Sequence, residues 1–165
     1  ISKSHISYMP SNISFYPQMR GLDLVSFYRD LNPDFDLAYA QKYLQAFNID
    51  LKKKIKTFSD GEKKLLALTI CLSFKRKLYI IDEPFPNVDI LNDEIVRKMI
   101  IEKYNETTTF IIATHQINEF EKVANKCLLI KNPQEIEILN TDDIRYELNC
   151  SIEEYFKERI RCLKY

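Results

Sequence analysis

The chain has 165 residues, of which 45% are hydrophobic and 29% are charged. A chain of this length fits one domain that buries roughly 70% of its unfolded surface. Lys plus Arg and Asp plus Glu number 24 each, so net charge gives no argument for a nucleic-acid partner or an anionic membrane. The cysteines form no C-x-x-C pair and show no metal-ligand spacing, which favours a reduced cytosolic setting. No apolar run has the length of a membrane span, and no signal peptide is visible.

The N-terminal part predicts a strand and an aromatic bend. Residues 5–9, HISYM, predict the strand, and Ser11 lies in the polar turn behind it. The bend, FYPQMRG at residues 15–21, contains three large apolar side chains: Phe15, Tyr16 and Met19. They form either a surface for a partner or ordinary core under a loop.

Two helices and a basic linker follow. Residues 22–31 predict the first helix and residues 37–47 the second. One face of the second helix collects apolar residues at helical spacing: Ala40, Tyr43, Leu44 and Phe47. The linker at residues 51–56 contains KKKIK, which is either a solvated surface or a patch for phosphate or nucleic acid.

The next helix, residues 60–74, begins with a recognisable capping pattern. Ser59 followed by Glu62 predicts a capping box, in which each residue satisfies a backbone N–H of the other. Gly61 lies inside the first turn, where glycine costs about 1 kcal/mol relative to alanine. The box alone is compatible with a purely structural helix start. Close approach of a phosphate to the helix N-terminus would explain the glycine.

Two carboxylates follow a short apolar run. Residues 78–81, LYII, predict a strand buried on both faces of a parallel sheet. Asp82 and Glu83 come directly after it, and Pro84 ends the strand. Open α/β sheets bind ligands at the carboxyl ends of their strands, so these acids are candidates for a site.

A second strand end is expected beside the first. Residues 90–104 predict a helix and residues 107–113, TTTFIIA, the next buried strand. A strand, helix and strand in this order form a right-handed crossover, which makes the two strands parallel. His115 is therefore expected at the same edge of the sheet as Asp82 and Glu83.

The C-terminal part predicts short elements. They are a helix at 116–123, strands at 127–130 and 135–139, a helix at 142–147, and a last helix opened by a second capping box, Ser151 with Glu154.

Four motifs in this order resemble the ABC-type ATPase (nucleotide-binding) domain. FSDGE at 58–62 resembles the signature motif LSGGQ, LYIIDE at 78–83 resembles Walker B with its catalytic glutamate, PNVD at 86–89 resembles the D-loop, and ATH at 113–115 resembles the switch-histidine motif. Phe58, Asp60 and Glu62 depart from the usual signature, and Ser11 stands near the position of the family's Q-loop glutamine.

This resemblance implies an α/β fold: a parallel-sheet core of the P-loop NTPase type with an inserted α-helical subdomain. The core would comprise about residues 1–14 and 75–165, and the helical subdomain about residues 15–74, within one partial domain spanning 1–165. The chain has only two glycines, Gly21 and Gly61, so it contains no G-x-x-x-x-G-K-[ST] phosphate loop. We expect it to be the later part of the domain, without the first β-subdomain, and to be inactive alone.

The implied function is ATP hydrolysis coupled to transport, with ATP and Mg²⁺ as cofactors. Asp82 would hold the metal ion, Glu83 would orient or deprotonate the attacking water, and His115 would contact the γ-phosphate. The remaining candidate nucleotide contacts are Ser11, Ser59, Asp60, Gly61, Glu62 and Asp89.

The implied partners are transmembrane permease subunits of an exporter-type system and a second ATPase subunit in a head-to-tail dimer. The protein would be cytoplasmic and peripheral on the inner face of the cell membrane, with no nucleic acid expected. Two alternatives stay open: a soluble ABC-type ATPase acting on ribosomes or DNA, and a non-hydrolysing interaction module.

Overall fold

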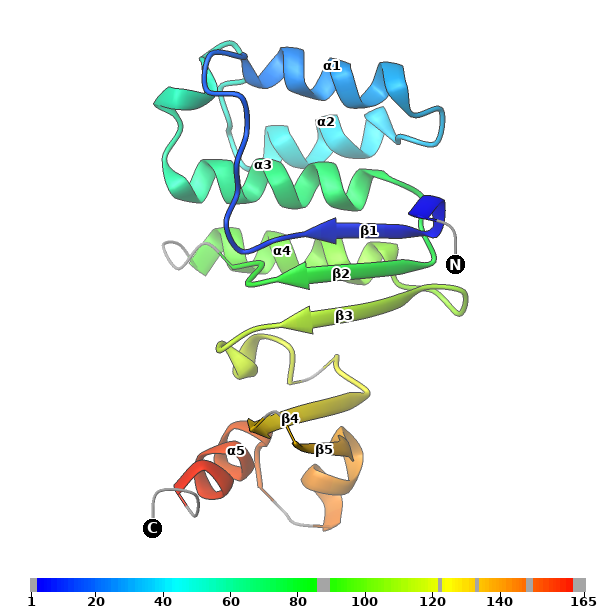
Figure 1. Cartoon of the computed structure of the whole chain (residues 1–165), viewed down its shortest axis with the longest axis vertical. Helices are drawn as coiled ribbons and strands as arrows, with labels where there is room; N and C mark the ends of the chain where they lie inside the picture. The colour runs from blue at the N-terminus through cyan, green and yellow to red at the C-terminus, as the bar shows by residue number, and fades with distance from the viewer. Residues whose placement is uncertain (1–2, 86–89, 122, 133, 148–149, 162–165) are drawn as a thin grey trace. The chain divides into compact units, whose positions relative to one another are not determined.

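The structure is a computed structural model that describes residues 3–85, 90–121, 123–132, 134–147 and 150–161. The chain forms two compact units, Ile1–Thr114 and His115–Tyr165. In the first unit the elements are β1 (Ile6–Met9), α1 (Gly21–Leu31), α2 (Leu37–Ala46), α3 (Asp60–Ser73), β2 (Leu78–Asp82), α4 (Ile90–Lys103) and β3 (Thr109–Ala113) (Figure 1). The second contains β4 (Lys126–Asn132), β5 (Glu135–Asn140) and α5 (Ile152–Arg161).

The first unit is built on a parallel sheet of three strands in the order β1-β2-β3. The strands align in register, with Tyr8 paired to Ile80 and Ile80 paired to Ile111. The central strand is β2, the strand that ends in the two acids. The predicted parallel pairing of the strands before and after α4 is confirmed.

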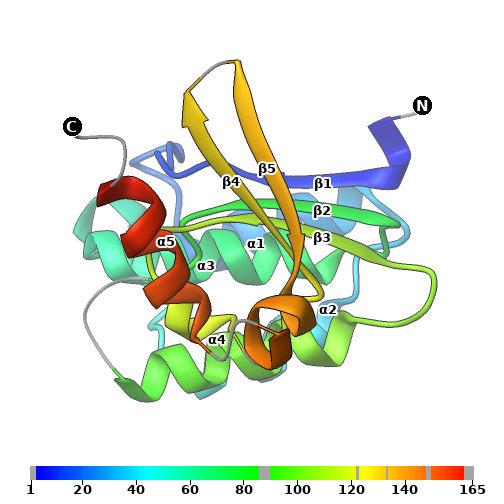
Figure 2. The same cartoon turned by 90° about the horizontal axis from the view of Figure 1, so that it is seen from below.

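The helices of this unit lie on one side of the sheet (Figure 2). Helix α3 packs on β1, and α1 and α2 pack on α3 (Figure 1). Side chains from both layers are completely or almost completely buried: Met9, Leu66, Leu68, Leu72, Ile81, Val96 and Met99. The core that supports the candidate site therefore lies between the sheet and the helices.

Burial of the sheet is one-sided, which corrects the expectation that β2 and β3 are buried on both faces. Tyr79 and Ile81 of β2 are buried, whereas Leu78, Ile80 and Asp82, which alternate with them, are only half-buried. In β3, Ile111 is 52% exposed and Phe110 is half-buried. Successive side chains of a strand point to opposite faces, so helices on one face bury only every second residue. A run of apolar residues in sequence does not distinguish this case from burial on both faces.

The predicted helices of the first unit are confirmed with small shifts at their ends. Helix α2 is capped by the Asp36 carboxylate, which accepts a hydrogen bond from the Tyr39 N–H at 2.9 Å. Helix α1 begins at Gly21, where an added Cβ would lie 2.9 Å from the Leu51 side chain and 3.2 Å from its Cα. This close approach requires glycine at position 21.

Polar contacts join α2 to α4. The Tyr39 hydroxyl donates to the Met99 carbonyl at 2.9 Å, and the Tyr43 hydroxyl donates to Glu102 Oε2 at 2.5 Å. Lys42 Nζ lies 2.6 Å from the same carboxylate oxygen. These contacts attach α2 to the helix that follows the two acids.

The second unit contains an antiparallel hairpin, β4–β5, and helix α5. The hairpin pairs Leu128 with Ile138 and Ile130 with Ile136, and all four side chains are 56–67% exposed. The unit's buried cluster contains Ile144, Ile152 and Tyr155. The second capping box is confirmed, because the N–H of Ser151 donates to the Glu154 carboxylate at 2.9 Å and the Glu154 N–H donates to Ser151 Oγ at 3.1 Å.

The predicted helix at 116–123 is wrong, because among its described residues, 116–121 and 123, the structure has only a 3-10 turn, Ile117–Glu119. The backbone hydrogen bonds from Phe120 to Ile117 and from Val123 to Phe120 join residues three apart, and the bond from Ala124 to Phe120 joins residues four apart. The apolar residues in this segment also recur every three residues, which matches the period of a 3-10 turn. Over the part of the chain that the structure describes, no helix is both long enough and apolar enough to span a bilayer.

Candidate functional site

The two acids lie at the carboxyl edge of the sheet. Asp82 is the last residue of β2 and is paired with Ala113, the last residue of β3. Both Asp82 and Glu83 are half-buried. The prediction that the ends of β2 and β3 share one edge is confirmed.

Glu83 has an unusual backbone conformation. Its φ is +51°, in the left-handed region that residues other than glycine rarely adopt. Two hydrogen bonds are made by this residue: its backbone N–H donates to the Ala113 carbonyl at 2.8 Å, and its side-chain Oε2 accepts from the Thr114 hydroxyl at 3.2 Å. A left-handed conformation costs about 1–2 kcal/mol, and such strain tends to occur at functional positions.

His115 follows the end of β3 by two residues and is exposed. It is the first residue of the second compact unit, whereas Asp82 and Glu83 belong to the first. Its contact with a γ-phosphate stays a prediction.

The start of α3 matches the predicted capping box. The Glu62 N–H donates to Ser59 Oγ at 3.1 Å, and the Ser59 N–H donates to Glu62 Oε2 at 2.7 Å. Asp60 is exposed and lies 2.9 Å from Lys63 Nζ, which offsets part of its negative charge. Gly61 is half-buried in the first turn. The capping box therefore satisfies backbone N–H groups of the helix start within the chain, and the role of its residues in binding stays a prediction.

Lys64 connects this helix to the segment that follows the acids. Its Nζ donates to the Phe85 carbonyl at 3.2 Å, and the Phe85 side chain is completely buried. Sequence reasoning missed Lys64, because no motif or periodicity singles it out. It also missed Thr114, although Thr114 is the middle residue of the ATH motif and could have been identified there.

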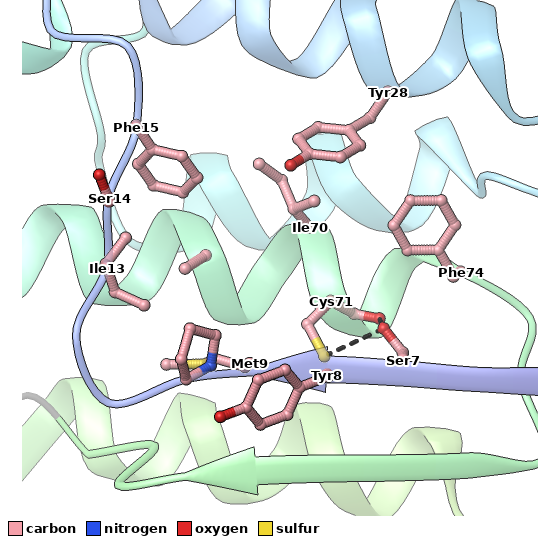
Figure 3. A pocket seen from close by; sticks show the side chains of 12 residues that line it. Ser7, Tyr8, Met9, Ile13, Ser14, Phe15, Tyr28, Ile70, Cys71 and Phe74 are labelled. Carbon is pink, nitrogen blue, oxygen red and sulfur yellow. Dashed lines mark hydrogen bonds between the residues drawn. The ribbon is translucent and has the colours of Figure 1, made fainter. Parts of the chain in front are cut away.

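Ser11 is exposed in the turn after β1. The chain on either side of it borders a cavity of about 220 Å³ between β1, α1 and α3 (Figure 3). Phe15 and Tyr28 line this cavity from opposite sides. Of the residues predicted for a partner surface, Tyr16 is 75% exposed, whereas Phe15 and Met19 are half-buried.

Cys71 lines the same cavity but is not a reactive thiol. The Ser7 hydroxyl donates to the Cys71 carbonyl at 2.8 Å, and its oxygen lies 3.2 Å from the Cys71 sulfur (Figure 3). Burial raises the pKa of the Cys71 thiol to about 11. The thiol is therefore protonated at neutral pH and is a poor nucleophile.

Asp82 fits a magnesium site of the kind that uses few protein ligands. The described residues contain no group of three or more His, Cys, Asp or Glu side chains placed to hold a metal ion. Magnesium in phosphate-transfer sites is commonly bound by one or two carboxylates together with substrate phosphates, so no larger group is required. Asp89 and the rest of the D-loop motif, residues 86–89, lie outside the described residues.

Comparison with known proteins identifies the family. A family model described as ABC transporter matches residues 1–86 of the 165. The ABC transporter ATP-binding protein YtrB of Bacillus subtilis (strain 168) is 26% identical over 146 residues, which cover 88% of this chain and 50% of that protein. The uncharacterized ABC transporter ATP-binding protein MJ1023 of Methanocaldococcus jannaschii is 26% identical over 84% of this chain and 55% of that protein. The chain thus spans about half the length of the curated relatives it matches.

Two solved structures show the same fold. An ATP-binding subunit of an ABC transporter superposes with a TM-score of 0.78 at 20% identity, covering 94% of this chain and 68% of that one. A putative metal-chelate type ABC transporter in an inward-facing conformation superposes with a TM-score of 0.64 at 27% identity, covering 85% of this chain and 59% of that one. With the acids at the end of the central strand and the family match over more than half of its residues, the chain belongs to the ABC transporter family and has the fold of its ATP-binding domain.

Proposed function

We propose that this chain is part of an ATP-hydrolysing subunit of an ABC transporter, which couples ATP hydrolysis to transport across a membrane. The observation that supports this most is the position and conformation of Glu83. It follows the central parallel strand directly in a left-handed backbone conformation, and it is hydrogen-bonded to Ala113 through its backbone and to Thr114 through its carboxylate. Backbone strain of this kind lowers stability and is found mostly at functional sites, where it serves to orient a side chain. A carboxylate that must point toward a reacting group is such a case.

In the proposed reaction, Glu83 orients a water molecule and accepts its proton. The water oxygen forms a bond to the γ-phosphorus while the bond from phosphorus to the β–γ bridging oxygen breaks, which releases ADP and phosphate. The hydrogen bond from Thr114 fixes one carboxylate oxygen of Glu83, so Thr114 acts as a positioning residue.

Asp82 would hold Mg²⁺, which neutralises charge on the β- and γ-phosphate oxygens when it is bound. Its half-buried carboxylate at the strand end provides the oxygen ligands that this ion prefers.

The start of α3 would contact nucleotide held by a second subunit. In a head-to-tail dimer, Ser59 and Gly61 of one subunit close over the nucleotide of the other, with Asp60 and Glu62 beside them. The backbone N–H groups at a helix N-terminus favour phosphate there. His115 and Asp89 complete the proposed set, and Ser11 occupies the Q-loop position.

The partners would be permease subunits of the membrane, with the protein peripheral on its cytoplasmic face. The segment after β1 supports this assignment, because it places the half-buried Phe15 at the cavity between the sheet and the helices. Aromatic side chains at such a surface are typical of protein interfaces.

The test is Glu83→Gln in a version of the protein extended to the length of its relatives. We expect ATP turnover to be lost while nucleotide binding is retained, since the amide keeps the size of the side chain but cannot accept a proton. Glu106→Gln, which changes an exposed loop residue by the same charge, is the control and should leave turnover unchanged. Full turnover in Glu83→Gln would remove Glu83 from its proposed role.

We further propose that the chain alone does not bind ATP tightly, because it contains no phosphate-loop motif. Nucleotide titration of this chain against the extended version measures the difference. Micromolar affinity in the chain alone would contradict this part of the proposal.

A further inference from the structure

A strongly basic surface of the first unit has no part in the proposed site. It consists of Lys52, Lys53, Lys54 and Lys56, here called the lysine loop, and all four side chains are exposed. The whole chain has a formal net charge of zero, so this loop concentrates positive charge that is balanced elsewhere in the molecule.

The lysine loop is held in place by backbone hydrogen bonds to the segment that precedes α1. The Gly21 N–H donates to the Lys53 carbonyl at 3.2 Å, the Ile55 N–H to the Met19 carbonyl at 2.9 Å, and the Lys56 N–H to the Pro17 carbonyl at 3.0 Å. Ile55 is only 2% exposed and anchors the loop in the core. The ammonium groups therefore extend from an ordered support.

Neighbouring acids do not neutralise this charge. Asp50 lies 4.0 Å from Lys53, but Asp60 is paired with Lys63, and Glu62 accepts from the cap residue Ser59. In the described part of the chain Lys52 and Lys56 form no ion pair, and Lys54 contacts the neutral Gln18. Three of the four positive charges are thus available to an external anion.

Exposed apolar side chains lie at both ends of the loop. Leu22 is 52% exposed, and its N–H donates to the Leu51 carbonyl beside Lys52. Tyr16 is 75% exposed and precedes Pro17, whose carbonyl accepts from the Lys56 N–H. Tyrosine and leucine next to lysines are typical of surfaces that meet the interface between water and lipid.

We propose that the lysine loop, with Tyr16 and Leu22, binds an anionic membrane surface. Lysine ammonium groups are flexible point charges that suit laterally mobile lipid headgroups, whereas fixed carboxylates of a protein partner are more often recognised by the planar fork of arginine. The proposal does not depend on the nucleotide site, because it concerns a different surface and a different ligand.

The first experiment measures co-sedimentation of the chain with phosphatidylcholine vesicles that contain or lack phosphatidylglycerol. We expect binding to the anionic vesicles only, weakening as salt is added. Neutralising Lys52, Lys54 and Lys56 together by Lys→Gln should lower the partition coefficient on the order of 100-fold, since each lysine near an anionic surface contributes about fivefold.

Two variants serve as controls. Replacing Lys75, Lys77 and Lys98 by glutamine removes the same charge from exposed positions away from the loop and should change binding little. Lys→Arg at positions 52, 54 and 56 keeps the charge and should keep binding. The far-UV circular dichroism and thermal midpoint of each variant confirm that it is folded.

The chain has no tryptophan, which permits a site-specific test. In Tyr16→Trp the only indole lies at the proposed contact, so its emission should shift to the blue on addition of anionic vesicles. Tyr104→Trp places the indole at another exposed tyrosine, 57% accessible, and should show no shift.

Three results would overturn the proposal. The first is that the parent chain does not bind anionic vesicles. The second is that the lysine-loop variant and the control variant lose vesicle binding equally. The third is that the chain binds soluble polyglutamate but not vesicles. The last result would assign the surface to an acidic polypeptide instead. None of these measurements involves nucleotide. A negative result would therefore overturn the membrane proposal without affecting the proposed ATPase role, which the Glu83→Gln variant tests.

Discussion

At the scale of single residues, Glu83 combines backbone strain with a carboxylate at a strand end. Its φ is +51°, its N–H donates to the Ala113 carbonyl, and its carboxylate accepts from the Thr114 hydroxyl. At most positions a protein with glycine is less stable than the same protein with alanine. At a position with left-handed backbone conformation the order is reversed, because alanine is strained there and glycine is not.

Comparing Glu83→Gly with Glu83→Ala isolates the backbone contribution. Both substitutions remove the carboxylate, and only alanine keeps a Cβ. We expect the glycine variant to have the higher free energy of unfolding, by about 1 kcal/mol. Urea denaturation followed by circular dichroism measures it. If the alanine variant is equally or more stable, position 83 is not strained.

Sequence alone identified the acids and the capping box at residue scale. Ser59 and Glu62 were predictable because a capping box is a local pattern, complete within one helical turn. The conformation of Glu83 was not, because its backbone N–H bonds to Ala113 on another strand, far away in sequence, and no glycine marks the turn. The contact of Lys64 was not predictable for the same reason, because its partner Phe85 is distant in sequence.

At the scale of elements, the contact between α2 and α4 combines buried aromatic rings with polar groups. Lys42 and Tyr43 of α2 both contact the Glu102 carboxylate of α4. The hydrogen bond from Lys42, followed by that from Tyr43, lowers the pKa of Glu102 below its usual range.

This pKa shift predicts a pH dependence of stability. Because the folded pKa is lower than the unfolded value of about 4.3, ionised Glu102 stabilises the fold above that pH and loses its effect as the pH falls through the folded pKa. The side chain is 41% exposed, so screening limits its contribution to under about 1 kcal/mol.

The corresponding variant is Glu102→Gln. It should lower the free energy of unfolding at pH 7, and the difference from the parent should shrink as the pH approaches about 4 and below. Urea denaturation at several pH values measures this difference, with Glu106→Gln as the control. A difference that is constant with pH would mean that Glu102 acts through packing rather than charge.

Helices were more predictable than the burial of strands. The period of α2 and the caps of α3 and α5 are local signals, and their helices formed where expected. Burial of β2 and β3 depends on which sheet face the helices cover, which a short apolar run does not encode. The 3-10 turn at Ile117–Glu119 was missed because a spacing of three fits both a short helix and a 3-10 turn.

At the scale of the whole molecule, the chain divides after Thr114. The sequence predicted a core of residues 1–14 and 75–165 with a helical subdomain of 15–74, and that subdivision stays a prediction. In the structure, segments from both predicted parts share the first unit, because α3 packs on β1 and α2 is joined to α4. The motifs located the acids but did not encode these long-range contacts.

This division predicts different behaviour of two fragments. Residues 1–114 contain a sheet with helices and a core of many buried side chains, so we expect them to unfold cooperatively in urea. Residues 115–165 have a small buried cluster and an exposed apolar hairpin face, so we expect no cooperative transition. A cooperative transition in the shorter fragment, or none in the longer one, would contradict the division.

The hydrogen bond between Lys64 and Phe85 has a mechanical consequence. It connects the second turn of α3 with a completely buried ring only two residues after Glu83. A displacement of that helix relative to the strand end would therefore either break this hydrogen bond or move the backbone at Phe85. One hydrogen bond and two residues of backbone therefore connect α3 to the acid at the strand end.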